Sequence, residues 1–455
     1  MKTLPLSKII LMSFISLHMG LFYTQANADE IDDLKRQIEL LTRKIEIMEQ
    51  EEAAAEAAAT AQAEAIPVET VDMSKVVMQG DRRNSIKIPG TDTSLSINGR
   101  VETSLIYDIG PRPTSRGGDI AAARRAVLEG TPEHENRGDT RLTARNSRFN
   151  IQTTTPTRLG LMRTFMEGDF NGLPNNKGSR ATTNRTAFGI RHAYGEFSGT
   201  YGTVLFGQYW SSFMDRTVFP DKVDGTGPVG RTFIRQGQLR YTKHFEGGGE
   251  WAFALENPRA DFDDADDENL HDGYPDLVSF YRYETDRWHL QFTGLLRRVG
   301  INDGLPGGVK DNTTSWGMNQ SGRITLPWNE DEITWYLIWG DGIGRYMEGA
   351  ANQGTSITAD GRLDTQFSYG GFLTYKHWWS DTLHSNIDFG VSYFDLNPEE
   401  VADANKELYS SHINLIWDPI DKLSFGIEYI WARREVHDGR EGTINRAQFI
   451  SKIFF

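Results

Sequence analysis

The feature that most constrains this chain is an alternation of apolar and polar residues that recurs from Ser94 to the C-terminus. In residues 95–107, Leu, Ile, Val and Tyr side chains occupy one face, while Ser, Asn, Arg and Glu occupy the other. Residues 387–393 and 423–431 repeat this pattern. A period of two residues indicates β-strands rather than helices. The polar face of such strands lies outside in a soluble sandwich and inside in a membrane barrel.

The connections between the predicted strands alternate between short and long. Tight turns are predicted at 155–157, 285–286, 327–330 and 418–420, each after an even-numbered strand. This alternation is typical of outer-membrane barrels, which have short periplasmic turns and long outer loops. The predicted fold is therefore an all-β transmembrane barrel of 16 antiparallel strands in residues 94–455. The predicted strands are 94–108, 145–155, 159–171, 187–198, 202–210, 233–243, 249–257, 277–284, 287–297, 315–326, 331–340, 366–376, 383–394, 408–417, 421–432 and 444–455.

Residues 1–28 are predicted to be a signal peptide. They contain Lys2 and Lys8, an apolar stretch over 9–22, and the small-residue cleavage site Ala26-Asn27-Ala28. The alternative is a retained helix that is amphipathic or anchors the chain, but the apolar stretch is short for a bilayer span. We therefore expect export to the bacterial outer membrane, with the N-terminal extension in the periplasm.

Residues 29–65 are predicted to form a helical periplasmic extension, followed by a linker over 66–93. Apolar residues spaced 3-4-3-4-3 are typical of a coiled-coil seam. An isolated amphipathic helix that packs on its own barrel is the alternative. Ile at position a with Leu at position d favours a dimer, but the larger barrel is expected to decide the oligomeric state. The predicted seam is Ile31, Leu34, Ile38, Leu41, Ile45 and Met48.

The composition excludes several classes of protein. The absence of Cys excludes disulfide scaffolds and thiolate metal sites, and a pI near 5.2 argues against nucleic-acid binding. The glycine pattern at 225–230 precedes no helix, and the acidic run 261–268 lacks the EF-hand spacing. No cofactor, metal or enzymatic activity is therefore predicted. Of the −17 charge left after signal-peptide removal, −7 lies in 29–65 and −7 in 258–276, so the barrel and linker carry only −3.

Many of the charged residues have the parity of the inner barrel face. Such residues either form ion pairs across the wall or act on ions that pass. The third long connection, residues 211–232, is expected to fold inward as a constriction loop, by analogy with trimeric sixteen-stranded porins. The pore-lining candidates from the wall are Arg148, Arg163, Arg240, Arg282 and Arg323, and those from the loop are Asp215, Asp221, Asp224 and Arg231.

The chain resembles the DcaP-like outer-membrane porins. The matching stretches are IPGTDTSLSIN (88–98), RNSRF (145–149), RHAYGEF (191–197), LFGQYW (205–210) and the residues of 220–241. The resemblance implies a homotrimeric porin that takes up small anions, notably dicarboxylic acids. It adds Arg191 and Arg235 to the pore-lining candidates, although Arg191 and His192 compete for the inward position. The loops 109–144 and 258–276 do not obviously match.

The expected partners are outer-membrane lipid and lipopolysaccharide, further copies of the chain, small anionic solutes, and the barrel-assembly machinery. The last strand presents alternate apolar residues and ends at Phe455, which resembles the C-terminal assembly signal of outer-membrane proteins. Two other functions are considered. The coiled coil would suit an envelope tether or adhesin-like barrel. An outer-membrane lipase or protease would need a nucleophile–base pair near a rim.

Overall fold

The computed structural model describes residues 35–48, 50, 78–113, 120–172, 187–259, 273–302, 310–398 and 400–455. The chain divides into two compact units, Met1–Val76 and Val77–Phe455. In the first unit, residues 35–48 and 50 are helical. No helix within the described ranges is long and apolar enough to span a bilayer. The predicted signal peptide and the seam residues Ile31 and Leu34 lie outside the described residues.

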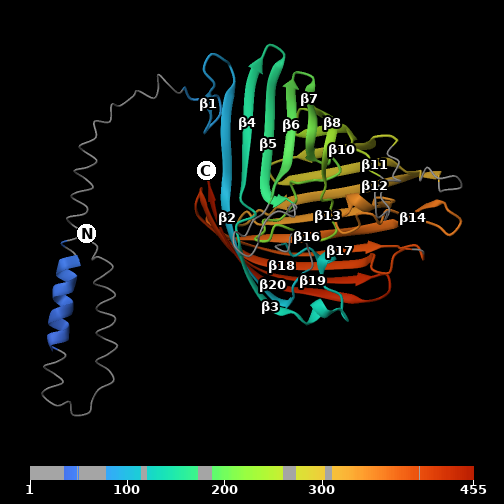
Figure 1. Cartoon of the computed structure of the whole chain (residues 1–455). Coiled ribbons are helices and arrows are strands. Elements are labelled where there is room, and N and C mark those ends of the chain that lie inside the picture. The colour runs from blue at the N-terminus through green and yellow to red at the C-terminus, as the bar shows by residue number, and fades with distance from the viewer. Residues whose placement is uncertain are drawn as a thin grey trace. The chain divides into compact units, whose positions relative to one another are not determined.

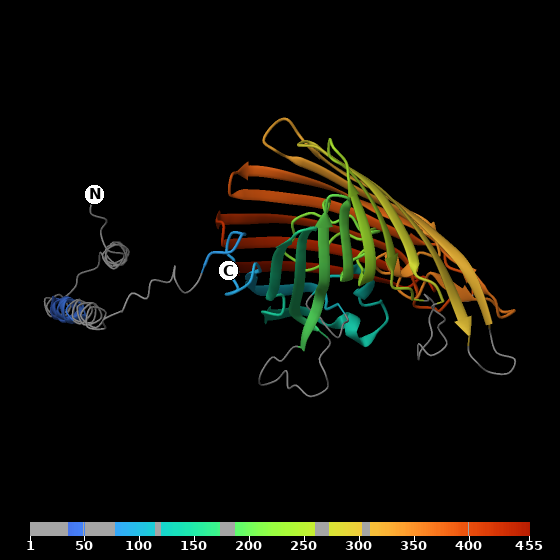
Figure 2. The ribbon, with the colours of Figure 1, turned by 90° about the horizontal axis from the view of Figure 1, so that it is seen from above.

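In the second unit, sixteen antiparallel strands form a closed barrel (Figures 1 and 2). Each strand pairs with its neighbour along the chain, and β2 pairs with β20 to close the sheet. Gly99 and Phe455 exchange two backbone hydrogen bonds of 3.1 Å, so the closure extends to the last residue. The barrel strands are β2 (Ser94–Pro111), β4 (Arg148–Thr157), β5 (Gly160–Gly172), β6 (Ala187–Gly199), β7 (Gly202–Trp210), β8 (Arg235–His244), β9 (Gly249–Glu256), β10 (Asp276–Glu284), β11 (Trp288–Asn302), β12 (Lys310–Thr325), β13 (Glu332–Asp341), β16 (Phe367–Ser380), β17 (Leu383–Phe394), β18 (Asn405–Ile420), β19 (Leu423–Val436) and β20 (Glu441–Phe454).

The predicted second strand, 145–155, corresponds to β4, and the residues predicted to form the loop 109–144 contain a further strand. β3 (Arg137–Thr143) pairs with the far half of β2, and β4 pairs with its first half. The first long loop is therefore shorter than the predicted 109–144. Two predicted turns are also wrong: β4 continues to Thr157, and β18 continues to Ile420 after a register shift. Both predictions placed a turn at a proline, but these prolines lie near strand ends, where a missing N–H is tolerated.

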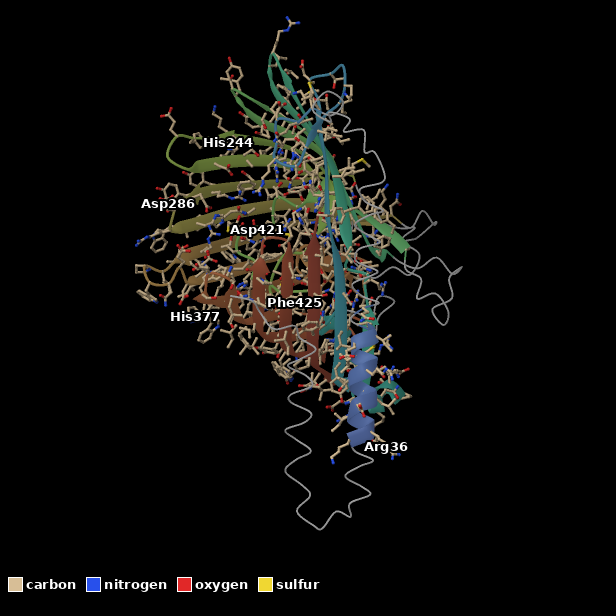
Figure 3. The ribbon with its side chains drawn as sticks, turned by 90° about the vertical axis from the view of Figure 1, so that its left-hand side faces the viewer. Arg36, His244, Asp286, His377, Asp421 and Phe425 are labelled. Atoms are coloured by element: carbon tan, nitrogen blue, oxygen red, sulfur yellow. The ribbon has the colours of Figure 1, made fainter. Side chains whose placement is uncertain are left out.

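The remaining short elements do not belong to the sixteen strands of the barrel wall. β1 (Ile86–Lys87) pairs with the start of β2, and β14 (Thr355–Ile357) pairs with β15 (Leu363–Thr365). Three 3-10 helices are η1 (Ala123–Arg125), η2 (Pro132–Glu135) and η3 (Gly344–Tyr346). Figure 3 labels His244, Asp286 and His377, which lie along the edge of the barrel where strands are joined by short turns.

The distribution of polar residues in the wall is the reverse of that in a soluble protein. On β2, the outward side chains of Ile97 and Val101 are 55% and 53% exposed. The inward side chains of Glu102, Ser104 and Asp108 are buried. The same alternation continues round the sheet, with large apolar and aromatic residues outside. A contiguous apolar outer surface of this extent suits lipid rather than water.

Three connections enter the lumen and fill part of it. Residues 211–234 follow β7, residues containing η1 follow β2, and residues containing η3 follow β13. Phe213 and Tyr346 pack edge to face with ring centroids 5.7 Å apart, and both side chains are fully buried. They belong to one apolar cluster that reaches the inner faces of β9, β10, β11, β13 and β16 to β20. The open space therefore lies mainly beside β2 and β4 to β10.

Candidate solute-binding site in the barrel lumen

A cavity of about 700 Å³ lies between residues 210–235 and the inner faces of β2, β4, β5, β6 and β20. Among the residues that the structure describes, nine Arg or Lys side chains and four carboxylates line it. The lining is therefore positive, although the whole chain is acidic. The nine basic residues are Arg100, Arg125, Arg148, Arg191, Arg216, Lys222, Arg231, Arg235 and Lys452.

Trp210, at the end of β7, organises the arginines of this cavity. The guanidinium carbon of Arg235 lies 4.7 Å from the centroid of its ring, that of Arg216 5.4 Å and that of Arg191 5.9 Å. Phe233 packs against the same indole with ring centroids 4.9 Å apart. A cation over an aromatic face is stabilised by the negative face of the ring. The indole thus holds three guanidinium groups in one place without neutralising them.

Ion pairing is uneven among these arginines. Arg191 binds Glu167 at 2.8 Å and Asp169 at 2.7 Å, and Arg231 binds Glu348 at 2.7 Å. The carboxylates of β5 come no closer than 3.5 Å to Arg148. In the described parts of the chain, Arg216 and Arg235 form no ion pair, and Nη1 of Arg235 has no hydrogen-bond partner. These two guanidinium groups are therefore available to a solute.

A β-bulge decides how Arg191 and His192 are arranged. In the pairing of β5 with β6, Glu167 faces His192 and Gly168 faces Ile190, so Arg191 is the extra residue. A bulge of this kind turns two consecutive side chains to one side of a strand. Arg191 reaches Glu167 in the lumen, and the buried His192 ring packs 5.5 Å from that of Trp210. The two residues share the inner face instead of competing for it.

A second cavity, of about 450 Å³, lies towards the short-turn end of the barrel. Arg240 and Arg282 line it together with Glu196 and Glu250, and Arg216 borders both cavities. Arg240 lies 5.4 Å from the ring centroid of Tyr209, and no ion pair of Arg240 is found within the described residues. Arg282 is shared between Glu250 and Gln291. Positive side chains therefore continue from the first cavity towards the short turns.

Two further predicted arginines lie in the wall without bordering either cavity. Arg163 donates a hydrogen bond of 3.0 Å to Gln152 and lies 5.4 Å from the ring centroid of Phe165. Arg323 binds Glu284 at 2.9 Å near the end of β12. The paired state of Arg323 makes it a useful control, because its charge is largely balanced.

The loop carboxylates hold the loop in place. The Asp215 carboxylate is fully buried, accepts a hydrogen bond from Ser321 and contacts His289 at 2.7 Å, so it does not line the passage as predicted. Burial alone would raise the pKa of Asp215, but the hydrogen bond and the charge of His289 outweigh burial and hold that pKa below its ordinary value. Asp224 is also buried and pairs with Arg446 at 3.4 Å, although it borders the first cavity.

Asp221 is the exposed carboxylate of the loop. Its side chain is 55% exposed, borders the first cavity, and binds Lys376 at 2.8 Å. The position of Asp221 against the wall acts to raise its pKa, but the His384 ring 3.5 Å away and the charge of Lys376 hold this pKa below its ordinary value. Asp221 therefore stays ionised. Of the three predicted loop carboxylates, it is the one that faces the cavity with an exposed side chain.

The backbone of residues 229–230 lies directly on the far wall. Gly230 has a φ of +79°. A Cβ added to it would collide with the backbones of Gly371 and Val391, and one added to Gly390 would collide with the backbone of Val229. The close approach of loop and wall therefore requires glycine on both sides.

We expect Gly390→Val to displace residues 229–230 from the wall, because the new side chain occupies the space of the Val229 backbone. Such overpacking costs about 1–3 kcal/mol. Single-channel recordings should show a higher conductance and more frequent fluctuations. Gly237→Val is the matched control, because a Cβ there meets nothing within 4 Å. Equal conductance of the Gly390→Val variant and wild type would contradict this account of the loop.

The described part of the predicted coiled-coil seam is solvent-exposed in the single chain. Ile38 and Leu41 are each 59% exposed, and Met48 is 54% exposed. Ile45 lies on the same helix. These residues are available for contact with another helix, and the coiled coil itself remains a prediction.

The sequence pattern did not identify Trp210 as the centre of the arginine cluster. The only local signal was a pair of aromatic residues, Tyr209 and Trp210, at the junction of a strand with a long loop. It also did not predict that η1 and η3 enter the lumen. Their contacts are made to residues far away in the sequence, which no local pattern indicates.

The closed barrel, with its polar lumen and inserted loop, has the fold of a porin-like outer-membrane channel. Solved structures with this fold include the outer membrane channel DcaP of Acinetobacter baumannii, with a TM-score of 0.68 and 19% identity over 81% of this chain and 99% of that one. The anion-selective porin of Comamonas acidovorans gives a TM-score of 0.53 and 10% identity over 80% of this chain and 100% of that one.

The trimer form of OmpT from Vibrio cholerae gives a TM-score of 0.50 and 9% identity over 80% of this chain and 99% of that one. No curated protein sequence matches the chain. The model of the DcaP outer membrane protein family matches residues 69–455. The chain belongs to this family, which confirms the resemblance inferred from its motifs.

Proposed function

We propose that this protein is an outer-membrane channel through which small anions diffuse, with a preference for dicarboxylates. The observation that carries the proposal is the pair of guanidinium groups, Arg216 and Arg235, that the described carboxylates leave without an ion pair beside Trp210. In a water-filled passage such charges need no buried partner and act on passing ions. The family and the solved structures of this fold are channel proteins, one of them an anion-selective porin.

The preference for dicarboxylates follows from the succession of cationic groups. Arg216 borders both cavities, with Arg235 in the first cavity and Arg240 and Arg282 in the second. A small dianion gains attraction from more than one arginine at each position, whereas a monoanion of the same size gains about half as much. In this proposal residues 211–232 form the constriction and Arg148, Arg191 and Arg231 complete its positive side.

The proposal includes the assembly of the protein. Three copies associate through their barrels and through the N-terminal helices, whose exposed Ile38, Leu41 and Met48 form the seam. The extension then lies in the periplasm and the barrel contacts outer-membrane lipid and lipopolysaccharide. Phe455, at the site of barrel closure, is read by the assembly machinery.

The test is the reversal potential of the purified protein in a planar bilayer under a KCl gradient. We expect an anion-selective value. Succinate added at equal ionic strength should reduce the chloride current at about tenfold lower concentration than butyrate, which has the same number of carbons and one carboxylate. A cation-selective value would contradict the proposed preference, and equal reduction by both acids would contradict the preference for dicarboxylates.

A further inference from the structure

His289 connects the inserted loop to the barrel wall through both of its ring nitrogens. The residue lies on β11 and is fully buried. Its Nε2 lies 2.7 Å from Oδ2 of Asp215 on the loop, and its Nδ1 contacts the Glu284 carboxylate at the end of β10. The same oxygen of Asp215 accepts a 2.7 Å hydrogen bond from Ser321 on β12.

This geometry requires a particular protonation state. An ionised carboxylate can only accept hydrogen bonds, so a ring nitrogen that faces one must carry a proton. His289 faces a carboxylate on each side, and both bonds are present together only when the ring is an imidazolium. A neutral ring can donate to Asp215 or to Glu284, but not to both.

Other histidines that contact the loop or its surroundings lack two hydrogen-bonded carboxylates. The His384 ring lies 3.5 Å from Asp221 and 3.9 Å from Asp418, but within the described residues neither ring nitrogen has a hydrogen-bond partner. His412 contacts Glu428 through Nδ1, but within the described residues its Nε2 has no partner. His244 contacts Glu250 through one nitrogen and the Thr203 hydroxyl through the other. A hydroxyl can donate as well as accept, so the neutral ring satisfies both contacts.

Asp215 and Arg216 are neighbours that point to different places. The Asp215 side chain is held against β11 by His289, while the guanidinium carbon of Arg216 lies 5.4 Å from the ring centroid of Trp210. A movement of Asp215 away from the wall therefore displaces the guanidinium group of Arg216, which borders both cavities.

We propose that His289 is a proton-dependent positioning residue for the anion passage. In its doubly protonated form it clamps residues 211–217 to β10 and β11 and thereby holds Arg216 at Trp210. The loss of one proton as the pH rises breaks one of the two contacts, loosens the loop and weakens the preference for anions. This inference rests on the proposed channel function.

The clamp has charged surroundings on every side. Two arginines limit the negative charge of the two carboxylates: Arg282 lies 4.0 Å from Asp215, and Arg323 lies 2.9 Å from Glu284. The charged groups next to the clamp are Asp215 on the loop, Glu284 and Arg282 on β10, Glu250 on β9, Arg323 on β12 and Glu332 on β13.

The experiment records reversal potential and closure frequency of the full chain in planar bilayers from pH 5.5 to pH 9.5. For wild type we expect a stable, anion-selective channel at low pH and a transition to weaker selectivity and more frequent closures at higher pH. Glu284→Gln removes one of the two carboxylates that retain the second proton, so its transition should fall by about one pH unit or more. His289→Gln should abolish the transition, and His437→Gln, outside the lumen wall, should leave it unchanged.

A wild-type profile that is flat across this range would overturn the inference, as would a transition that neither Glu284→Gln nor His289→Gln moves. A protein that conducts at no pH would contradict the channel proposal itself. The clamp is then tested without conductance, by the unfolding temperatures of wild type and Asp215→Asn in detergent. A difference between them that becomes smaller as the pH rises supports the clamp, because the neutral ring keeps only one of the two contacts, and a constant difference overturns it.

Discussion

The double variant Arg216→Glu/Arg235→Glu is expected to lose the anion preference and to become cation-selective. Both guanidinium groups border the first cavity and neither forms an ion pair with the described residues, so their charges act on the solute in full. A unit charge about 4 Å from an ion contributes about 1 kcal/mol in water. Reversal of two such charges should lower the anion-to-cation permeability ratio by at least about tenfold.

The matched control for this variant is Arg323→Gln. Arg323 also belongs to the inner wall, but it binds Glu284 at 2.9 Å and borders neither cavity. At low pH, where the doubly protonated His289 holds the loop in wild type and variant alike, its loss should change the reversal potential little. The measurement is the reversal potential of wild type, the double variant and Arg323→Gln under the same KCl gradient. If Arg323→Gln altered selectivity as much as the double variant, the cluster at Trp210 would not be the selective element.

Arg446→Met is expected to destabilise the barrel and release the loop. Arg446 is fully buried on β20, where it pairs with Asp108 of β2 at 2.7 Å and with Asp224 of the loop at 3.4 Å. Asp108 keeps its 2.6 Å ion pair with Arg141, but Asp224 loses the ion pair that it forms with Arg446. Removal of one member of a buried pair costs about 3–5 kcal/mol.

The readout is the temperature at which the folded barrel unfolds in detergent, together with single-channel conductance. Arg446→Met/Asp224→Asn should recover much of the lost stability, because the carboxylate left without its partner is then neutral. Arg440→Met removes an exposed ion pair of the β19–β20 turn and should change the unfolding temperature little. A failure of the second substitution to recover stability would show that the side chain of Arg446 matters through packing and not through charge.

The strands and the side of each strand that faces the lumen could be predicted from the alternation of residues along the chain. Predicted strands 202–210 and 383–394 have the same bounds as β7 and β17, and the others are displaced mainly at their ends. This is possible because a barrel strand faces lipid on one side and water on the other. Successive residues therefore alternate between apolar and polar, and this alternation is visible within a single strand. The inward parity of Arg148, Arg240 and Arg282 follows from the same local rule.

Tertiary structure decided what those inward residues do. The bulge that turns both Arg191 and His192 inward depends on the register between β5 and β6, which the alternation of one strand does not contain. Asp215 is 74 residues from His289, and Asp224 is 222 residues from Arg446. These contacts exist only after the barrel has closed around the loop. Such contacts decide which carboxylates hold the loop and which arginines are left to face the passage. Ion pairing depends on distance in space and not on position in the chain.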